Sequence, residues 1–116
     1  MSHQQATQAV RAGIETDEQY GAVTPALYLS SNYTFEGLGS PRKYDYSRSG
    51  NPTRDVLADC LAELEGGAGA VVTSSGMSAV HLVTQLLEPG DLVVVPHDCY
   101  GGTYRLFTSL AKKGGC

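Results

Sequence analysis

Two short apolar runs constrain the fold of this 116-residue chain more than any other feature. Residues 70–73 (AVVT) and 92–95 (LVVV) are rich in β-branched residues, and glycine or proline turns bound them. Continuous apolar strands of this length are typical of parallel sheets that helices cover on both faces. Because a helical pattern follows each run, we predict an α/β fold with a right-handed crossover.

Two strands are too few for a sheet that is covered on both faces. We therefore expect the 116 residues to be the first part of a larger domain. Residues 1–50 are interpreted as an N-terminal arm that has to lean on another element, and residues 51–116 as the start of the α/β domain. Residues 1–43 show no sustained period, although residues 24–35 favour short extended pieces.

The clearest helical signal begins at Asn51, a residue type that caps helices, and Pro52 suits the first helical position. The helix is predicted to stop at Gly66. Its apolar residues fall on one face: Val56, Leu57, Cys60, Leu61 and Leu64.

Two further helices are predicted after the apolar runs. Residues 77–87 are apolar on nearly every side, which predicts a buried helix. Residues 103–113 form the second, with Thr103 as its candidate cap.

Composition excludes several function classes. With a formal net charge of −4 and 17% charged residues, the chain has neither the basic excess of nucleic-acid binders nor the polarity of disordered tails. We expect no membrane span, because no apolar run approaches the roughly 20 residues needed to cross a bilayer. We also expect a cytoplasmic location, because the N-terminus lacks the basic-then-apolar order of a signal peptide. No metal site is expected, since His97, Asp98 and Cys99 are consecutive and cannot converge on one ion.

Three places in the chain are candidates for chemistry. Ser74, Ser75 and Gly76 lie between the first strand and a helix N-terminus, where backbone N–H groups favour an anion such as phosphate. A tight strand-to-helix turn explains the same residues equally well. Tyr100 follows the second strand, where it could stack on a flat ring or simply cover the sheet edge.

Half of the eight basic residues lie in or just before the segment YDYSRSGNPTR, residues 44–54. They are Arg42, Lys43, Arg48 and Arg54. Arginine offers a fork of donors to phosphate or carboxylate, and a tyrosine hydroxyl adds one directed hydrogen bond. The alternative is an ordinary solvated basic face.

Three ordered segments together resemble the cystathionine γ-synthase group of pyridoxal-phosphate (PLP) enzymes of Cys/Met metabolism. They are YDYSRSGNPTR (44–54), SSGMSAVHL (74–82) and HDCYGGTYRLF (97–107), and the flanking sequence is similar as well. The resemblance implies a fold-type I, aspartate aminotransferase-like PLP domain. It also implies a homo-oligomer, a dimer of dimers, in which the arm of residues 1–50 contacts the neighbouring subunit and active sites are shared between subunits.

The resemblance assigns cofactor roles to five residues. Tyr46 and Arg48 match residues that hold the PLP phosphate of the neighbouring subunit. Gly76 and Met77 match backbone donors to the phosphate within the subunit. Tyr100 matches a tyrosine that stacks on the pyridine ring and helps to move protons, which makes it the candidate catalytic residue.

The resemblance also predicts the reaction. Asp45 and Arg105 match positions near the amino-acid substrate, and the implied activity joins L-cysteine to an O-acyl-homoserine in methionine biosynthesis. Cystathionine γ-lyase, β-lyase, methionine γ-lyase and sulfhydrylase activities remain alternatives, as does a non-catalytic phosphate-binding role. No lysine of the chain matches the family's Ser-x-Thr-Lys segment, so we expect this chain alone to be inactive.

Overall fold

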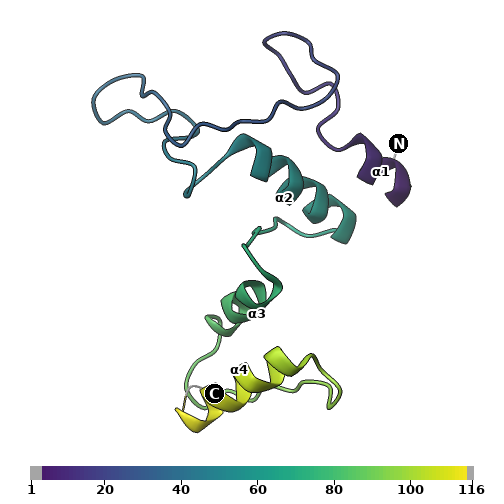
Figure 1. Ribbon diagram of the computed structural model, residues 1–116, viewed down its shortest axis with the longest axis vertical. Helices are drawn as coiled ribbons and strands as arrows, with labels where there is room; N and C mark the ends of the chain where they lie inside the picture. The colour runs from purple at the N-terminus through teal and green to yellow at the C-terminus, as the bar shows by residue number, and fades with distance from the viewer. Residues whose placement is uncertain (1–3, 115–116) are drawn as a thin grey trace. The chain divides into compact units, whose positions relative to one another are not determined.

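The computed structural model describes residues 4–114, and these residues contain four helices. Helix α1 spans Gln5–Arg11, α2 Pro52–Glu65, α3 Gly76–Thr84 and α4 Gly101–Lys112 (Figure 1). The chain divides into two compact units, Met1–Val72 with α1 and α2, and Thr73–Cys116 with α3 and α4. The division into residues 1–50 and 51–116 stays a prediction about a complete subunit.

Helix α2 confirms its sequence signals. The Asn51 side chain accepts hydrogen bonds from the backbone N–H of Thr53 at 2.9 Å and of Arg54 at 3.2 Å. Pro52 occupies the first turn, where its missing N–H costs no hydrogen bond. Gly66 ends the helix in the left-handed conformation, and its N–H bonds to the last carbonyls.

Helix α1 was missed by the sequence analysis. It has seven residues and no side-chain cap, so the sequence contains neither a hydrophobic period nor a capping residue that would predict it. It packs against α2, where Gln5 Nε2 donates to the Leu64 carbonyl at 3.3 Å and Gln8 Nε2 to Glu63 Oε1 at 3.1 Å. Tertiary contact with α2 thus stabilises a helix that is too short to be stable alone.

Residues 12–50 contain no helix and only two isolated β-bridges, Asn32 with Tyr46 and Gly37 with Ser40. The N-terminal end of α2 holds this arm. The Tyr28 N–H donates to Thr53 Oγ1 at 2.9 Å, and Asn51 Nδ2 donates to the Tyr28 carbonyl at 3.0 Å. These hydrogen bonds fix part of the arm to α2, and the contact of the arm with a neighbouring subunit stays a prediction.

In the second unit, Ser75 caps α3 by accepting from the Ser78 N–H at 3.1 Å, and α3 packs against α4. Helix α4 begins at Gly101, and Tyr100 precedes it without a side-chain cap bond. The prediction that Thr103 caps this helix is therefore wrong, because Thr103 lies inside the first turn.

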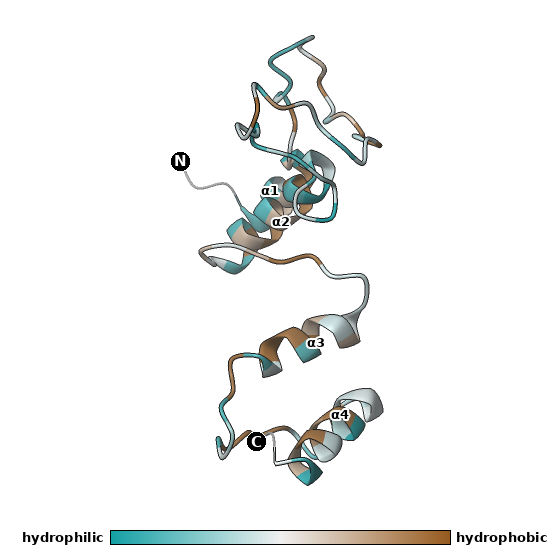
Figure 2. Cartoon of the chain, turned by 90° about the vertical axis from the view of Figure 1, so that its left-hand side faces the viewer, coloured by the Kyte–Doolittle hydropathy of each residue, from teal (hydrophilic) through white to brown (hydrophobic). Residues whose placement is uncertain are grey.

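Two further predictions about the α/β domain are not met by this structure. Within residues 4–114, neither 70–73 nor 92–95 forms a strand, because a strand exists only through hydrogen bonds to a neighbouring strand and neither run has one. Helix α3 is not buried: Leu82 is 45% and Val83 59% exposed. Figure 2 shows this helix as one of the most hydrophobic parts of the chain, with no sheet among the described residues to cover it.

No helix in the described part of the chain is long and apolar enough to cross a membrane. The longest, α2, has 14 residues and is thus about 21 Å long, against the roughly 30 Å of a hydrocarbon core. Among the same residues, no group of three or more His, Cys, Asp or Glu side chains is placed to hold a metal ion.

Removing the α2 cap should destabilise the helix start. We expect Asn51→Ala to lower the free energy of unfolding by about 1 kcal/mol, because the Thr53 and Arg54 amides lose their acceptor. Amide hydrogen exchange at these two residues should accelerate. Gln4→Ala is the matched control, since Gln4 stands at the N-cap of α1 without a side-chain cap bond. Equal exchange rates in Asn51→Ala and the unsubstituted protein would contradict this assignment.

Candidate functional site

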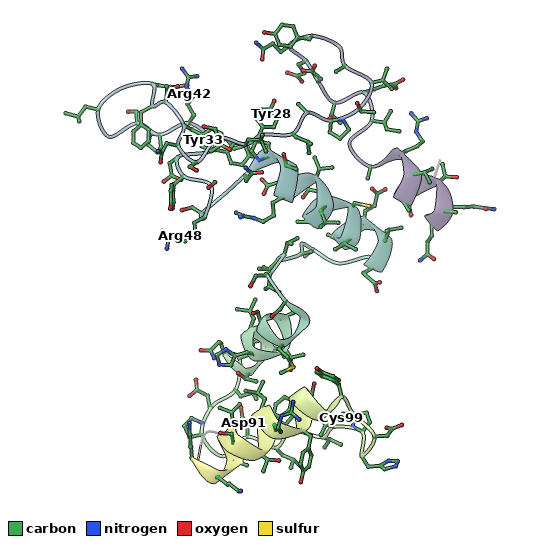
Figure 3. The ribbon with its side chains drawn as sticks, in the orientation of Figure 1. Tyr28, Tyr33, Arg42, Arg48, Asp91 and Cys99 are labelled. Carbon is green, nitrogen blue, oxygen red and sulfur yellow. The ribbon has the colours of Figure 1, made fainter. Side chains whose placement is uncertain are left out.

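Tyr46 and Arg48 lie in contact on the loop that leads into α2. Arg48 Nη2 donates to the Tyr46 hydroxyl at 2.9 Å, and the Arg48 guanidinium carbon lies 5.1 Å from the centre of the Tyr46 ring. The Arg48 side chain is exposed, and Figure 3 shows it projecting from the loop. The two predicted phosphate ligands of the arm thus form one exposed, positively charged pair.

Backbone pairing holds the loop that carries this pair. The Tyr33 N–H donates to the Asp45 carbonyl at 3.0 Å, and the Ser47 N–H donates to the Ser31 carbonyl at 2.8 Å. Beyond the pair the chain turns, and the Gly50 N–H closes onto the Tyr46 carbonyl at 3.0 Å. Residues on either side of Tyr46 are therefore fixed to a second segment of the arm.

Asp45, the predicted substrate residue, is exposed and adjoins the pair. Its carboxylate accepts a hydrogen bond from the Tyr46 backbone N–H at 2.6 Å. This contact ties the carboxylate to the loop and leaves its second oxygen available to another donor.

Sequence reasoning missed a polar cluster beside the loop. The Tyr44 hydroxyl donates to Asp55 Oδ2 at 2.7 Å, and the Lys43 ammonium lies 5.1 Å from the centre of the Tyr44 ring. Burial raises the pKa of the Tyr44 phenol above its usual range, and the hydrogen bond to the Asp55 carboxylate raises it further. Tyr44 therefore stays neutral and bonds the arm to α2.

The second unit contains a cavity of about 500 Å³ beside the N-terminus of α3. It is lined by Ser75, Gly76, Met77, Val80, Tyr100 and Thr103. Gly76 and Met77 are in the first helical turn, where the helix itself offers their N–H groups no acceptor. The Ser75 hydroxyl accepts its capping hydrogen bond from the Ser78 N–H, so it does not engage the N–H of Gly76 or of Met77. The geometry suits an anion at this helix end.

Tyr100 and Met77 converge on Gly102. A Cβ atom on Gly102 would lie 2.6 Å from Tyr100 Cε1 and 2.9 Å from Met77 Sδ. Only glycine therefore lets both side chains approach α4 so closely. The Tyr100 side chain is 71% exposed beside the cavity, so one face of its ring is free to stack on a planar ligand.

The structure brings the predicted residues together in two groups. Asp45, Tyr46 and Arg48 are neighbours in the first unit, and Gly76, Met77 and Tyr100 line one cavity in the second. Arg105 is in α4 but does not line that cavity; its Nη1 lies 3.4 Å from where a Cβ on Gly101 would be. The predicted role of Arg105 stays a prediction.

Comparison with known proteins identifies the family. Residues 6–116 match the family described as Cys/Met metabolism PLP-dependent enzyme. The chain belongs to this family. The predictions of the family and of pyridoxal phosphate as its cofactor are thereby confirmed.

Individual relatives agree with this result. The chain is 66% identical over 115 residues to a cystathionine gamma-synthase of Escherichia coli (strain K12), covering 98% of this chain and 30% of that protein. It is 44% identical over 109 residues to a cystathionine beta-lyase of Lactococcus lactis subsp. cremoris, covering 94% of this chain and 29% of that protein. The chain thus spans about 30% of the length of these relatives.

A solved structure supports the fold class. The crystal structure of cystathionine gamma synthase from Xanthomonas oryzae pv. oryzae in complex with cystathionine is similar with a TM-score of 0.92 and 62% identity. The similarity covers 99% of this chain and 30% of that one. The backbone therefore follows the corresponding part of a PLP-dependent enzyme, even though its predicted strands have no neighbours here.

The residues present fit the cofactor. PLP combines a phosphate dianion with a flat pyridine ring. The cavity offers the unbonded first-turn amides of α3 for the phosphate and the exposed Tyr100 ring for stacking. Arg48 and Tyr46 in the first unit add a fork of donors and a hydroxyl of the kind that binds phosphate.

We expect a methyl group at position 102 to displace Tyr100. In Gly102→Ala the new Cβ would overlap Tyr100 Cε1, so the ring has to rotate, and the NMR signals of the Tyr100 ring and the Met77 methyl group should shift together. Gly101→Ala is the matched control, because the nearest atom to its Cβ is the flexible Arg105 Nη1 at 3.4 Å. Unmoved Tyr100 signals in Gly102→Ala would refute the close packing.

Proposed function

We propose that this chain is part of a PLP-dependent γ-replacement enzyme that makes cystathionine from L-cysteine and an O-acyl-homoserine in methionine biosynthesis. The observation that carries the proposal is the graded similarity: 66% identity to a cystathionine gamma-synthase against 44% to a cystathionine beta-lyase. Asp45, placed beside the Tyr46–Arg48 pair, supports the same choice. The O-succinyl ester is one example of such a substrate.

In this proposal the second unit binds the cofactor of its own subunit. The N–H groups of Gly76 and Met77 donate to the phosphate, and the positive end of the α3 dipole stabilises its charge. Tyr100 stacks on the pyridine ring and holds or moves a proton through its hydroxyl. Bound PLP supplies an electron sink for charge that develops on the substrate.

The first unit is proposed to complete a neighbouring subunit's site. Tyr46 and Arg48 bind the phosphate of that subunit, and the subunits are proposed to form a homo-oligomer arranged as a dimer of dimers. The exposure of the pair is the supporting observation, since phosphate has to reach the guanidinium. Asp45 and Arg105 are proposed to orient the amino-acid substrate, and the protein is proposed to be cytoplasmic.

The proposal places the lysine that carries PLP outside these 116 residues, because Lys43, Lys112 and Lys113 lie in no matching segment. This chain alone is accordingly proposed to be inactive. Lys43 already lies over the Tyr44 ring and 4.0 Å from Asp55, a contact that suits a structural role.

The reaction is tested with the complete enzyme and O-succinylhomoserine, with and without L-cysteine. We expect cystathionine by mass spectrometry only when both substrates are present. Cleavage of added cystathionine without any synthesis would instead identify a lyase. A protein that binds PLP but transforms neither substrate would be a non-catalytic phosphate binder.

The sharing of sites is tested by mixing variants. Arg48→Ala should weaken PLP retention at least about tenfold, the size expected for a lost charge-assisted hydrogen bond. Subunits with Arg48→Ala are then mixed with subunits that lack the PLP-carrying lysine. Activity in the hybrid would support a site built from two chains, whereas inactive hybrids with normal assembly would show that each chain serves its own site.

A further inference from the structure

Arg54 reaches back from the first turn of α2 to the loop that carries Arg48. Its Nη1 donates to the Ser47 carbonyl at 2.9 Å, and its Nη2 donates to the Arg48 carbonyl at 3.3 Å. Its own backbone N–H is held by the Asn51 side chain at 3.2 Å. The residue is thus fixed at both ends, to the helix cap and to the loop.

The geometry distinguishes the two arginines. Arg48 is exposed and its side chain meets Tyr46, whereas Arg54 is half-buried and directs two of its donors at successive backbone carbonyls. A guanidinium spans two such carbonyls because its donors are set in a rigid, planar fork. Arg48 is therefore the arginine that can meet an anion, and Arg54 the one that holds the backbone under it.

No other hydrogen bond within residues 4–114 reaches the carbonyl oxygens of Ser47 and Arg48. The preceding residues are paired with the segment 31–33, and the following turn closes on Tyr46. Arg54 thus restrains a stretch of this loop, the Ser47 and Arg48 carbonyls, to which no backbone N–H donates. That stretch is where the Arg48 side chain departs.

We propose that Arg54 is a positioning residue for the cofactor phosphate: by clamping the Ser47 and Arg48 carbonyls, it presents the Arg48 guanidinium with Tyr46 to the phosphate. This inference rests on the proposed function, in which Arg48 contacts the phosphate. Without the clamp, Arg48 keeps its charge but has to be ordered when the phosphate binds, which costs conformational entropy.

The test compares PLP with pyridoxal, which has the same ring but no phosphate. Dissociation constants of both are measured on the apo form of the complete enzyme, for the unsubstituted protein, Arg48→Ala, Arg54→Ala and the double variant. We expect Arg54→Ala to weaken PLP binding about tenfold and pyridoxal binding not at all. The double variant should bind PLP no worse than Arg48→Ala, because Arg54 acts through Arg48.

Two further variants separate the clamp from charge and from general effects. Arg54→Lys keeps the positive charge but has no fork, so it should also weaken PLP binding and leave pyridoxal binding unchanged. It serves equally if Arg54→Ala fails to fold. Arg42→Ala is the control, since Arg42 is an exposed arginine of the same arm whose ion pair, 3.6 Å from Glu36, does not touch the loop backbone. It should bind both ligands normally.

Several results would overturn the proposal. Equal weakening of PLP and pyridoxal in Arg54→Ala would show a general structural role, and additive losses in the double variant would show that Arg54 acts independently of Arg48. If Arg54→Lys bound PLP as tightly as the unsubstituted protein does, the guanidinium fork would not be needed. If Arg48→Ala itself binds PLP and pyridoxal normally, the phosphate role of Arg48 fails, and this result is distinct from failure of Arg54 alone.

Discussion

The first unit depends on the hydrogen bonds at the N-terminus of α2. Asn51 accepts from the first amides of the helix and donates to the Tyr28 carbonyl and, at 3.3 Å, to the Tyr33 hydroxyl. The three residues that follow Pro52 each hold another part of the arm: Thr53 accepts from Tyr28, Arg54 holds Ser47 and Arg48, and Asp55 accepts from Tyr44. One helix turn therefore positions a loop that has no hydrophobic core.

The second unit depends instead on glycines that let a ligand approach the α3 backbone and let Tyr100 pack closely on α4. Gly76 at the start of α3 leaves the first backbone amides accessible, and Gly102 in α4 lacks the Cβ that would block Tyr100. The glycines at positions 76 and 102 therefore shape the cavity as much as the side chains that line it. A phosphate and a flat ring require this combination, because the phosphate has to reach the backbone while the ring needs an aromatic face.

Local signals predicted the structure where local interactions decide it. Helix α2 was predicted from Asn51, Pro52 and Gly66 because each acts within a few residues of its own position. The strands at 70–73 and 92–95 were wrong for the described residues, since strand pairing depends on distant partners. Helix α1 was missed because its stability comes from packing on α2.

The candidate site was predictable to a similar extent. The resemblance named Tyr46 and Arg48, and the structure adds that they touch. The role of Arg54 could not be predicted, because a side chain that binds backbone carbonyls leaves no signature in the residues it holds. The Tyr44–Asp55 bond was missed for the related reason that eleven positions separate a loop residue from its helical partner.

Polar contacts hold the described part of the chain together because hydrophobic burial contributes little there. No hydrophobic residue of the described part is buried, and Leu29 and Leu92 are 92% and 88% exposed. Burying such a side chain contributes about 1.5–3 kcal/mol, a gain that these residues do not make among themselves. In the proposed enzyme the surrounding protein would cover them, so hydrophobic burial would stabilise the subunit as a whole. The direction in which Arg48 points would still be set locally, by hydrogen bonds of about 1 kcal/mol each at the start of α2.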